Sequence, residues 1–268
     1  MSMSPLTAIS DGFVVAKRNL IKIKRIPDLI IFTLVQPIMF VLLFAYVFGG
    51  AINVPGVNYR EYLMAGIFVQ TVAFGSGLTA IGLAEDMQKG IIDRFRSLPM
   101  SRAAVLLGRT SSDLVNNALV VLVMTLCGLL VGWRIRDGFV EAVAGFALLL
   151  FFAYAMSWIA ATIGLSVRSV EVAQSAGLIW LFPLTFLSNA FISTDTLPGW
   201  LQPIADWNPV SSVILAVRDL FGNAPAGAGR GSGFPAEHPI LLAVLWSVAI
   251  LVIFMPLAVN RYRRAAAR

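Results

Sequence analysis

Apolar residues in this chain gather into long runs separated by short polar stretches. The hydrocarbon core of a bilayer is about 30 Å thick, and a helix needs about 20 predominantly apolar residues to cross it. Six runs meet this requirement, and we expect each to form a membrane-spanning helix: residues 29–48, 62–83, 103–133, 139–167, 172–192 and 240–259. Five polar residues precede the apolar part of the third run, so its start is expected in water: Arg102, Arg109, Asp113, Asn116 and Asn117. The pattern predicts an all-α integral membrane protein with one transmembrane domain over residues 1–268.

Two shorter amphipathic helices are expected outside these spans. The first covers residues 5–26: Ser4 suits an N-cap, Pro5 suits the first turn, and apolar and basic residues then take opposite faces. A basic amphipathic helix ahead of a hydrophobic span is typical of the membrane interface. The second covers residues 86–98 and ends where Pro99 cannot continue a helix. Its apolar side is formed by Met87, Ile91, Phe95 and Leu98.

The composition and the charge pattern both indicate a membrane protein. Hydrophobic residues make up 58% of the chain and charged residues 13%, whereas a soluble domain carries about 25% charged residues. The net charge of +6 does not indicate a nucleic-acid surface, because the basic residues cluster at the ends of the apolar runs. Of the 20 Lys and Arg residues, 15 fall on one side of the predicted membrane, which predicts that both termini and the 86–98 helix are cytoplasmic. The five on the other side are Arg60, Arg134, Arg136, Arg218 and Arg230.

The last connection between predicted spans contains a helical segment of its own. Asn208 and Pro209 form an N-cap and first-turn pair, and an apolar half-length helix follows them. Trp200 and Trp207 precede this helix, as aromatic rings do at a membrane interface. We expect residues 195–221 to form a re-entrant segment that dips back into the outer leaflet.

Motifs for catalysis are absent from the sequence. There is no Gly-x-x-x-x-Gly-Lys-Ser/Thr loop for ATP and no Gly-x-Ser-x-Gly elbow. One cysteine, Cys127, and one histidine, His238, argue against a metal site, and we predict no catalytic or metal-binding residue. No charged residue lies near the middle of a predicted span, where ion-coupled transporters keep such groups. The energy source is therefore expected to lie outside the chain.

Two other functions stay open on the residues alone. A membrane enzyme acting on lipid-linked substrates would need acidic residues clustered near one face of the membrane. The nearest candidates are Glu85, Asp86, Asp195 and Asp206. A channel-like or scaffold protein would work without nucleotide.

Weakly polar and aromatic residues interrupt the first, second and fifth predicted spans. They have two interpretations: hydrogen bonding and close packing between helices, or a path for an amphiphile lined by aromatic and weakly polar groups. The candidate path residues are Gln36, Tyr46, Gln70, Thr71, Phe74, Gln174, Thr185, Ser188 and Asn189.

Two stretches resemble one known family. They are DRFRSLPMSR at residues 93–102 and LSNAFISTDTLPGWLQPIADWNPVSSVILAVRDL at residues 187–220. In the second, Pro198-Gly-Trp, Trp207-Asn-Pro and the half-length helix come in the expected order. Together with the order of predicted helices, they make nearly the whole chain similar to the membrane subunit of a type-2 ABC exporter, in the daunorubicin-resistance permease group.

The resemblance implies a non-enzymatic permease subunit in a bacterial inner membrane. It would move a hydrophobic or amphiphilic compound, drug-like or lipid, out of the cytoplasm or the inner leaflet. It would form a homodimer, or a heterodimer with a sister subunit, bound to two copies of a separate ATPase subunit that holds ATP and magnesium. The substrate path would lie between the first, second and fifth spans of the two copies. The helix at 86–98 would be the coupling helix, seated in a groove of the ATPase, with the residues Met87, Lys89, Ile91, Asp93, Arg94, Phe95, Arg96 and Leu98.

Overall fold

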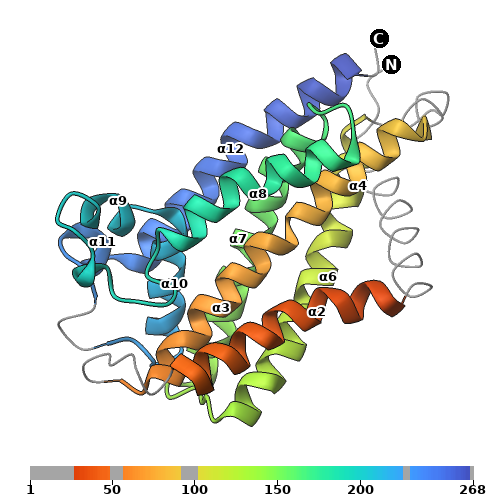
Figure 1. Ribbon diagram of the computed structural model, residues 1–268. Helices are drawn as coiled ribbons and strands as arrows, with labels where there is room; N and C mark the ends of the chain where they lie inside the picture. The colour runs from red at the N-terminus through yellow and green to blue at the C-terminus, as the bar shows by residue number, and fades with distance from the viewer. Residues whose placement is uncertain (1–26, 49–56, 92–101, 226–229, 266–268) are drawn as a thin grey trace.

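The computed structural model describes residues 27–48, 57–91, 102–225 and 230–265. Every regular element in these ranges is helical, which confirms the all-α class (Figure 1). The long helices are α2 (Pro27–Leu42), α3 (Tyr59–Gly75), α4 (Gly77–Gln88), α6 (Arg102–Val131), α7 (Phe139–Gly164), α8 (Val170–Phe186) and α12 (Pro239–Ala265). The shorter elements are the π-helix η1 (Leu43–Phe48), the 3₁₀-helix η2 (Thr194–Thr196), α9 (Gln202–Asp206), α10 (Pro209–Leu220) and α11 (Phe234–Glu237).

Four helices in the described ranges are long and apolar enough to cross a membrane: Tyr59–Gln88, Val105–Val131, Phe139–Gly164 and Pro239–Arg264. They correspond to the second, third, fourth and sixth predicted spans. The helices at the first and fifth positions have shorter apolar stretches, Leu34–Val47 and Val170–Phe186. Membrane crossing by these two helices therefore stays a prediction.

The fifth predicted span ends earlier than expected. α8 stops at Phe186, so the predicted end at residue 192 is wrong. Pro183 lies inside the last turns of α8 and has no N–H to donate to the preceding turn. The carbonyls of Leu184 and Leu187, which a continuing helix would use, instead accept hydrogen bonds from the Asn208 side-chain nitrogen at 2.7 and 2.6 Å.

The second predicted span is longer than expected and includes the first residues of the short helix predicted to follow it. α4 continues to Gln88, so the predicted start of a separate helix at residue 86 is wrong. Lys89 pairs with Glu85 over this last turn. Gly90, with φ of +63°, then turns the chain through a conformation that side chains with a Cβ rarely adopt. Residues 92–98 of the predicted coupling helix, and all of the predicted interfacial helix at 5–26, lie outside the described residues.

α7 is the centre of the bundle and packs against α3, α4, α6, α8, α10 and α12. Its Gly145 faces the ring of Phe221, and a Cβ on this glycine would lie only 2.6 Å from that ring. Phe221 also meets Trp133 and Phe146 at centroid distances of 5.4 and 4.9 Å. These aromatic contacts join the central helix to α10 and to the end of α6.

One end of the bundle, which we call the capped end, carries α9, α10 and α11 beside the start of α3 (Figure 1). α10 begins as the sequence predicts: the Asn208 side-chain oxygen accepts a hydrogen bond from the Val210 N–H at 2.8 Å, and Pro209 occupies the first turn. Most of α10 is buried against α3, α7 and α12. Trp200 and Trp207 are exposed. Entry of this segment into a membrane stays a prediction.

Candidate substrate pocket and its surroundings

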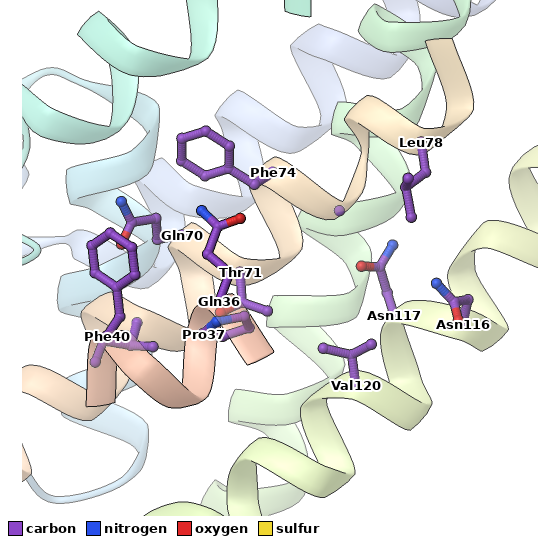
Figure 2. A pocket seen from close by; sticks show the side chains of 12 residues that line it. Gln36, Pro37, Phe40, Gln70, Thr71, Phe74, Leu78, Asn116, Asn117 and Val120 are labelled. Atoms are coloured by element: carbon purple, nitrogen blue, oxygen red, sulfur yellow. The ribbon is translucent and has the colours of Figure 1, made fainter. Parts of the chain in front are cut away.

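A cavity of about 170 Å³ lies between α2, the second half of α3, the first turn of α4 and the middle of α6. Figure 2 shows the side chains around this one space. Four carboxamides and one hydroxyl are combined there with two phenylalanine rings. The lining residues are Gln36, Pro37, Phe40, Ile67, Gln70, Thr71, Phe74, Gly75, Leu78, Asn116, Asn117 and Val120.

Three of the four carboxamides lack a protein partner. In the described part of the chain no side chain or backbone group hydrogen-bonds the carboxamide of Gln36, Gln70 or Asn116. Gln70 is only 6% exposed, but its carboxamide is not among the fully enclosed polar atoms, because it borders the cavity. An unpaired amide in an apolar environment costs several kcal/mol. The cavity therefore presents hydrogen-bonding groups that the protein leaves to water or to a bound molecule.

Asn117 is placed differently from the other three carboxamides. Its side-chain nitrogen donates to the Asp113 carbonyl at 3.0 Å, within its own helix. Its side-chain oxygen lies 2.5 Å from where a Cβ of Gly75 would be. Only glycine at position 75 therefore allows α3 and α6 to approach this closely.

The second long helix is interrupted at this point. α3 ends at Gly75 and α4 begins at Gly77. Between them the Ser76 hydroxyl donates to the Ala73 carbonyl at 2.6 Å, which satisfies a backbone group at the break. The break thus lies directly beside the pocket.

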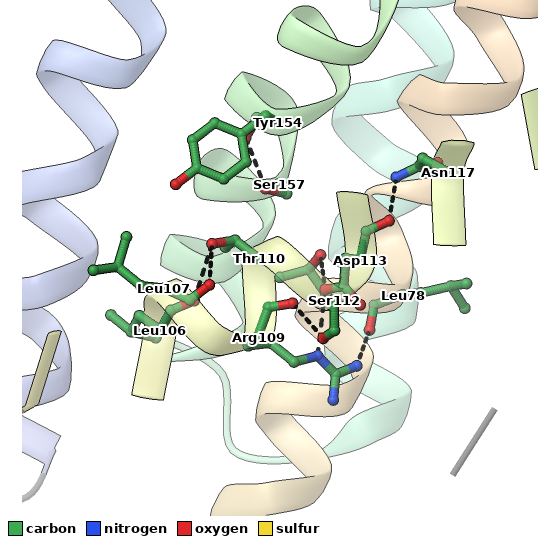
Figure 3. Close-up of polar contacts among 11 residues, drawn as sticks. Leu78, Leu106, Leu107, Arg109, Thr110, Ser112, Asp113, Asn117, Tyr154 and Ser157 are labelled. Atoms are coloured by element: carbon green, nitrogen blue, oxygen red, sulfur yellow. Dashed lines mark hydrogen bonds and ion pairs between the residues drawn. The ribbon is translucent and has the colours of Figure 1, made fainter. Parts of the chain in front are cut away.

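A polar cluster beside the pocket ties α4 to α6 (Figure 3). The Thr79 hydroxyl donates to Asp113 Oδ2 at 2.6 Å, and Arg109 Nε approaches the same oxygen at 3.3 Å. Arg109 Nη2 also donates to the Leu78 carbonyl at 3.2 Å. The guanidinium lies against Gly82, where a Cβ would collide with it. Because Arg109 and Asp113 pair with each other, no charged side chain lines the pocket.

The pocket gathers four of the nine predicted path residues: Gln36, Gln70, Thr71 and Phe74. Thr185 and Ser188 are buried and donate to the carbonyls of Leu181 and Thr185. Asn189 is also buried and donates to the Ser211 carbonyl at 3.4 Å. These three have the hydrogen-bonding role that was the other interpretation of the pattern.

The remaining two predicted path residues lie away from the pocket. Tyr46 is 58% exposed, with the Arg60 guanidinium 4.9 Å from its ring centroid. Gln174 is exposed on α8.

Sequence reasoning missed Asn116 and Asn117 as pocket residues. Both were placed ahead of the apolar part of the third span, within a helix predicted over residues 103–133. α6 runs from Arg102 to Val131, close to that range, so these residues lie at its midpoint. The length of the whole helix, rather than of its apolar part, was the signal that could have placed them.

The sequence counted Arg218 among the basic residues on the non-cytoplasmic side and did not indicate its environment. Arg218 is completely buried. Its Nε donates to the Tyr62 carbonyl at 2.9 Å, and its Nη2 donates to the Asn189 carbonyl at 2.8 Å. The guanidinium also stacks on the Tyr62 ring at 3.4 Å. Arg218 therefore fastens α10 to the start of α3 and to the segment after α8.

Two other basic residues at the capped end are paired with acids. Arg136 contacts Glu61 at 2.7 Å, and Arg230 contacts Asp219 at 2.6 Å. The hydrogen bond that Arg136 donates to Glu61 raises the pKa of Arg136 above its usual value. Three of the five basic residues on this side of the chain are therefore buried or paired with an acid, namely Arg218, Arg136 and Arg230.

The fold and the pocket together define a helical membrane permease: several apolar spans surround a weakly polar cavity at mid-helix. Residues 11–221 match the family described as ABC-2 type transporter, and the chain belongs to that family. It is thus a multi-pass membrane permease of the ABC transporter class, and this class implies an ATPase partner subunit.

Named relatives agree with this family. The chain is 32% identical over 257 residues to the daunorubicin resistance ABC transporter permease protein DrrB1 of Streptomyces coeruleorubidus, covering 96% of this chain and 87% of that protein. It is 26% identical over 239 residues to a probable doxorubicin resistance ABC transporter permease protein, DrrC, of Mycobacterium tuberculosis, covering 88% and 82%. It is also 26% identical over 227 residues to the putative transport permease ycf38 of Cyanophora paradoxa, covering 83% and 78%.

Proposed function

We propose that this chain is the membrane-spanning subunit of an ATP-driven exporter, which moves a hydrophobic or amphiphilic compound out of the cytoplasm or the inner leaflet. Family membership supports the ATP-driven class. The names of the Streptomyces and Mycobacterium relatives support a drug-like cargo. The observation that carries the transport path is the mid-helix pocket with its unpaired carboxamides.

The proposed assembly contains two permease copies, most simply a homodimer, and two ATPase copies that bind ATP and magnesium. Six spans would place both termini on the cytoplasmic side of a bacterial inner membrane. The positive charges of the sequence support this orientation.

Coupling would start at the cytoplasmic end of α4. The predicted coupling residues begin with Met87 in the last turn of this helix and continue through Leu98. A push on this segment by the ATPase would be passed along α4 as a rigid rod. Thr79 and Leu78 would carry the displacement to α6 through Asp113 and Arg109. Both helices line the pocket at this level, so its shape would change with the nucleotide state of the partner.

The break between α3 and α4 at Ser76 is where such a movement would be absorbed. α4 would move with the ATPase, while α3 is held at the capped end by Arg218. Hinges are commonly a few residues at the ends of elements. Gly75 and Leu78, on either side of this break, line the pocket, so the mechanical step would act next to the binding step.

The proposal is tested in inside-out proteoliposomes that contain the chain and its ATPase, with daunorubicin, which carries an amino group, and a neutral glycolipid as two separate probes. We expect ATP-dependent uptake with both proteins and no ATP hydrolysis by the chain alone. Phe95→Ala and Arg94→Glu should each lower uptake about tenfold by weakening the coupling between the sites. Membrane insertion should be unchanged.

A matched control is Phe139→Ala, since Phe139 is 85% exposed at the start of α7, far along the chain from the coupling segment. Its uptake should equal that of the parent protein. Hydrolysis of ATP by the purified chain, or full uptake by both coupling variants, would overturn the proposal.

A further inference from the structure

We propose that the pocket between α2, α3 and α6 recognises a single uncharged ring that carries hydroxyl or carbonyl groups, as the head of an amphiphile. The inference rests on the proposed export function and specifies which part of the exported compound the pocket binds. It follows from three properties of the pocket: its unpaired amides, its lack of charge and its size.

The amides determine the hydrogen-bonding chemistry of the ligand. Each carboxamide offers an oxygen that accepts and a nitrogen that donates two hydrogen bonds. Gln70 lies deep in the site at 6% exposure, while Gln36 is exposed and Asn116 half-buried at the rim. A ligand must therefore present both donors and acceptors at several positions. Hydroxyl groups do both, and carbonyl groups supply further acceptors.

The absence of charge determines the charge of the ligand. No lining residue is ionisable. The nearest acid identified beside the pocket, Asp113, is only 9% exposed and is already engaged by Thr79 and Arg109. An ion taken from water into such a site would lose its hydration and gain no counter-charge, which costs several kcal/mol. A neutral head is therefore favoured over a cationic or an anionic one.

The size determines how much of the ligand enters. The cavity measures about 170 Å³, and an engineered protein cavity of about 150 Å³ takes one benzene molecule. One six-membered ring fits inside the cavity, and a larger ligand would extend through its open side. Phe40 and Phe74 supply apolar faces for the ring, and Ile67 and Val120 add an aliphatic wall. The rest of an amphiphile would remain between the helices or in lipid.

The test uses the full chain with its ATPase in lipid nanodiscs and three probes that share one octyl tail. These are octyl glucoside, octyl trimethylammonium and octyl sulfate, each below its micellar concentration and corrected for binding to empty discs. We expect saturable binding of octyl glucoside, with affinity at least about tenfold above that of either charged probe.

Variants then locate this binding in the pocket. Gln70→Leu and Asn116→Leu remove hydrogen-bonding groups at nearly constant size, and each should weaken octyl glucoside binding about tenfold. Gln174→Leu makes the same change on the exposed face of α8 and should stay within about twofold of the parent. Size-exclusion chromatography verifies that each variant is intact, which apolar substitutions within predicted spans should allow.

Two competing ligands then show whether the bound ring belongs to a free solute or to a lipid headgroup. Displacement by methyl glucoside indicates a free solute, and displacement only by a monoglucosyl diacylglycerol indicates a lipid headgroup; either supports the inference. Equal binding of the three octyl probes, no saturable binding, or parent-like binding in Gln70→Leu would overturn it. If the pocket inference fails but ATP drives daunorubicin uptake, the proposed export function still stands. If the pocket binds octyl glucoside but ATP drives the uptake of no probe, the export function is wrong and the pocket inference still stands.

Discussion

The two polar regions inside this protein differ in whether their polar groups have hydrogen-bond partners within the protein. Around Arg218, a charged group is completely enclosed, and two of its nitrogens donate to the carbonyls of Tyr62, Asn189 and Ala190. In the pocket, neutral carboxamides are held at mid-helix with space in front of them and no protein partner in the described ranges. The first region is filled by the protein itself. The second is left to be filled by another molecule.

This difference separates a structural role from a binding role. Within the Arg218 cluster only Arg218 Nη1 and the Asn189 side-chain oxygen lack partners, and packing on Tyr62 covers the guanidinium face. Removing Arg218 would take a donor from the carbonyls of Tyr62, Asn189 and Ala190, and of these the Asn189 carbonyl would keep the Tyr62 hydroxyl as a donor at 3.0 Å. Removing a pocket carboxamide would relieve an unpaired group. Opposite effects on stability are therefore expected, and they provide ways to test the comparison.

The largest effect is expected for Arg218→Met. It should lower the free energy of unfolding by about 3 kcal/mol or more, because buried carbonyls lose a donor. Thermal unfolding in detergent measures this loss. Arg218→Lys, which keeps a donor, should recover part of the stability. A Met variant as stable as the parent would mean that the cluster does not hold the capped end together.

The next effect is expected for Gly66→Ala. A Cβ at Gly66 would overlap the backbone carbonyl of Ala190, one of the groups that Arg218 contacts. Backbone cannot rotate away as a side chain can, so about 1–3 kcal/mol should be lost. Gly177→Ala is the matched control, since its Cβ would meet no atom within 4 Å. It should be neutral or slightly stabilising, and equal losses in both variants would contradict the close-contact explanation.

Gln70→Leu should separate stability from function. The unfolding temperature should be unchanged or raised, because an unpaired amide is replaced by an apolar group. ATP-driven export of a ring-headed probe should nevertheless fall about tenfold, equivalent to about 1.4 kcal/mol. A variant that loses stability and export together would place Gln70 in the same structural category as Arg218.

The smallest effect on stability is expected at the end of α4. The hydrogen bond that Lys89 donates to Glu85 raises the pKa of Lys89, so any stabilisation exists below the ordinary lysine pKa and is lost only as pH rises through the raised one. Lys89→Gln should therefore leave unfolding unchanged between about pH 6 and pH 9, since both pKa values lie above this range and exposed pairs contribute little. Denaturation at these two pH values tests this, and a clear loss at neutral pH would give this end a structural role. A loss of transport without a loss of stability would support its coupling role.

Local features of the sequence predicted the local features of the fold. The Asn208-Pro209 pair specified the start of α10, because capping and the fixed φ of proline act within one turn. Pro183 was foreseeable as a disturbance of α8. The end of α8 was not, because it depends on Asn208, which is 21 residues further on and takes the Leu187 carbonyl.

The sequence by itself determined the class: apolar runs must be helical in lipid because each backbone amide needs a partner there, and two family stretches indicated the ABC-2 permease. The sequence could not decide which polar residues serve binding, because Gln70, Asn189 and Asn116 all carry the same carboxamide group. Only the tertiary structure separated them. It brought a partner to Asn189 and withheld one from Gln70 and Asn116, and the free energy of a buried amide depends on whether that partner is present.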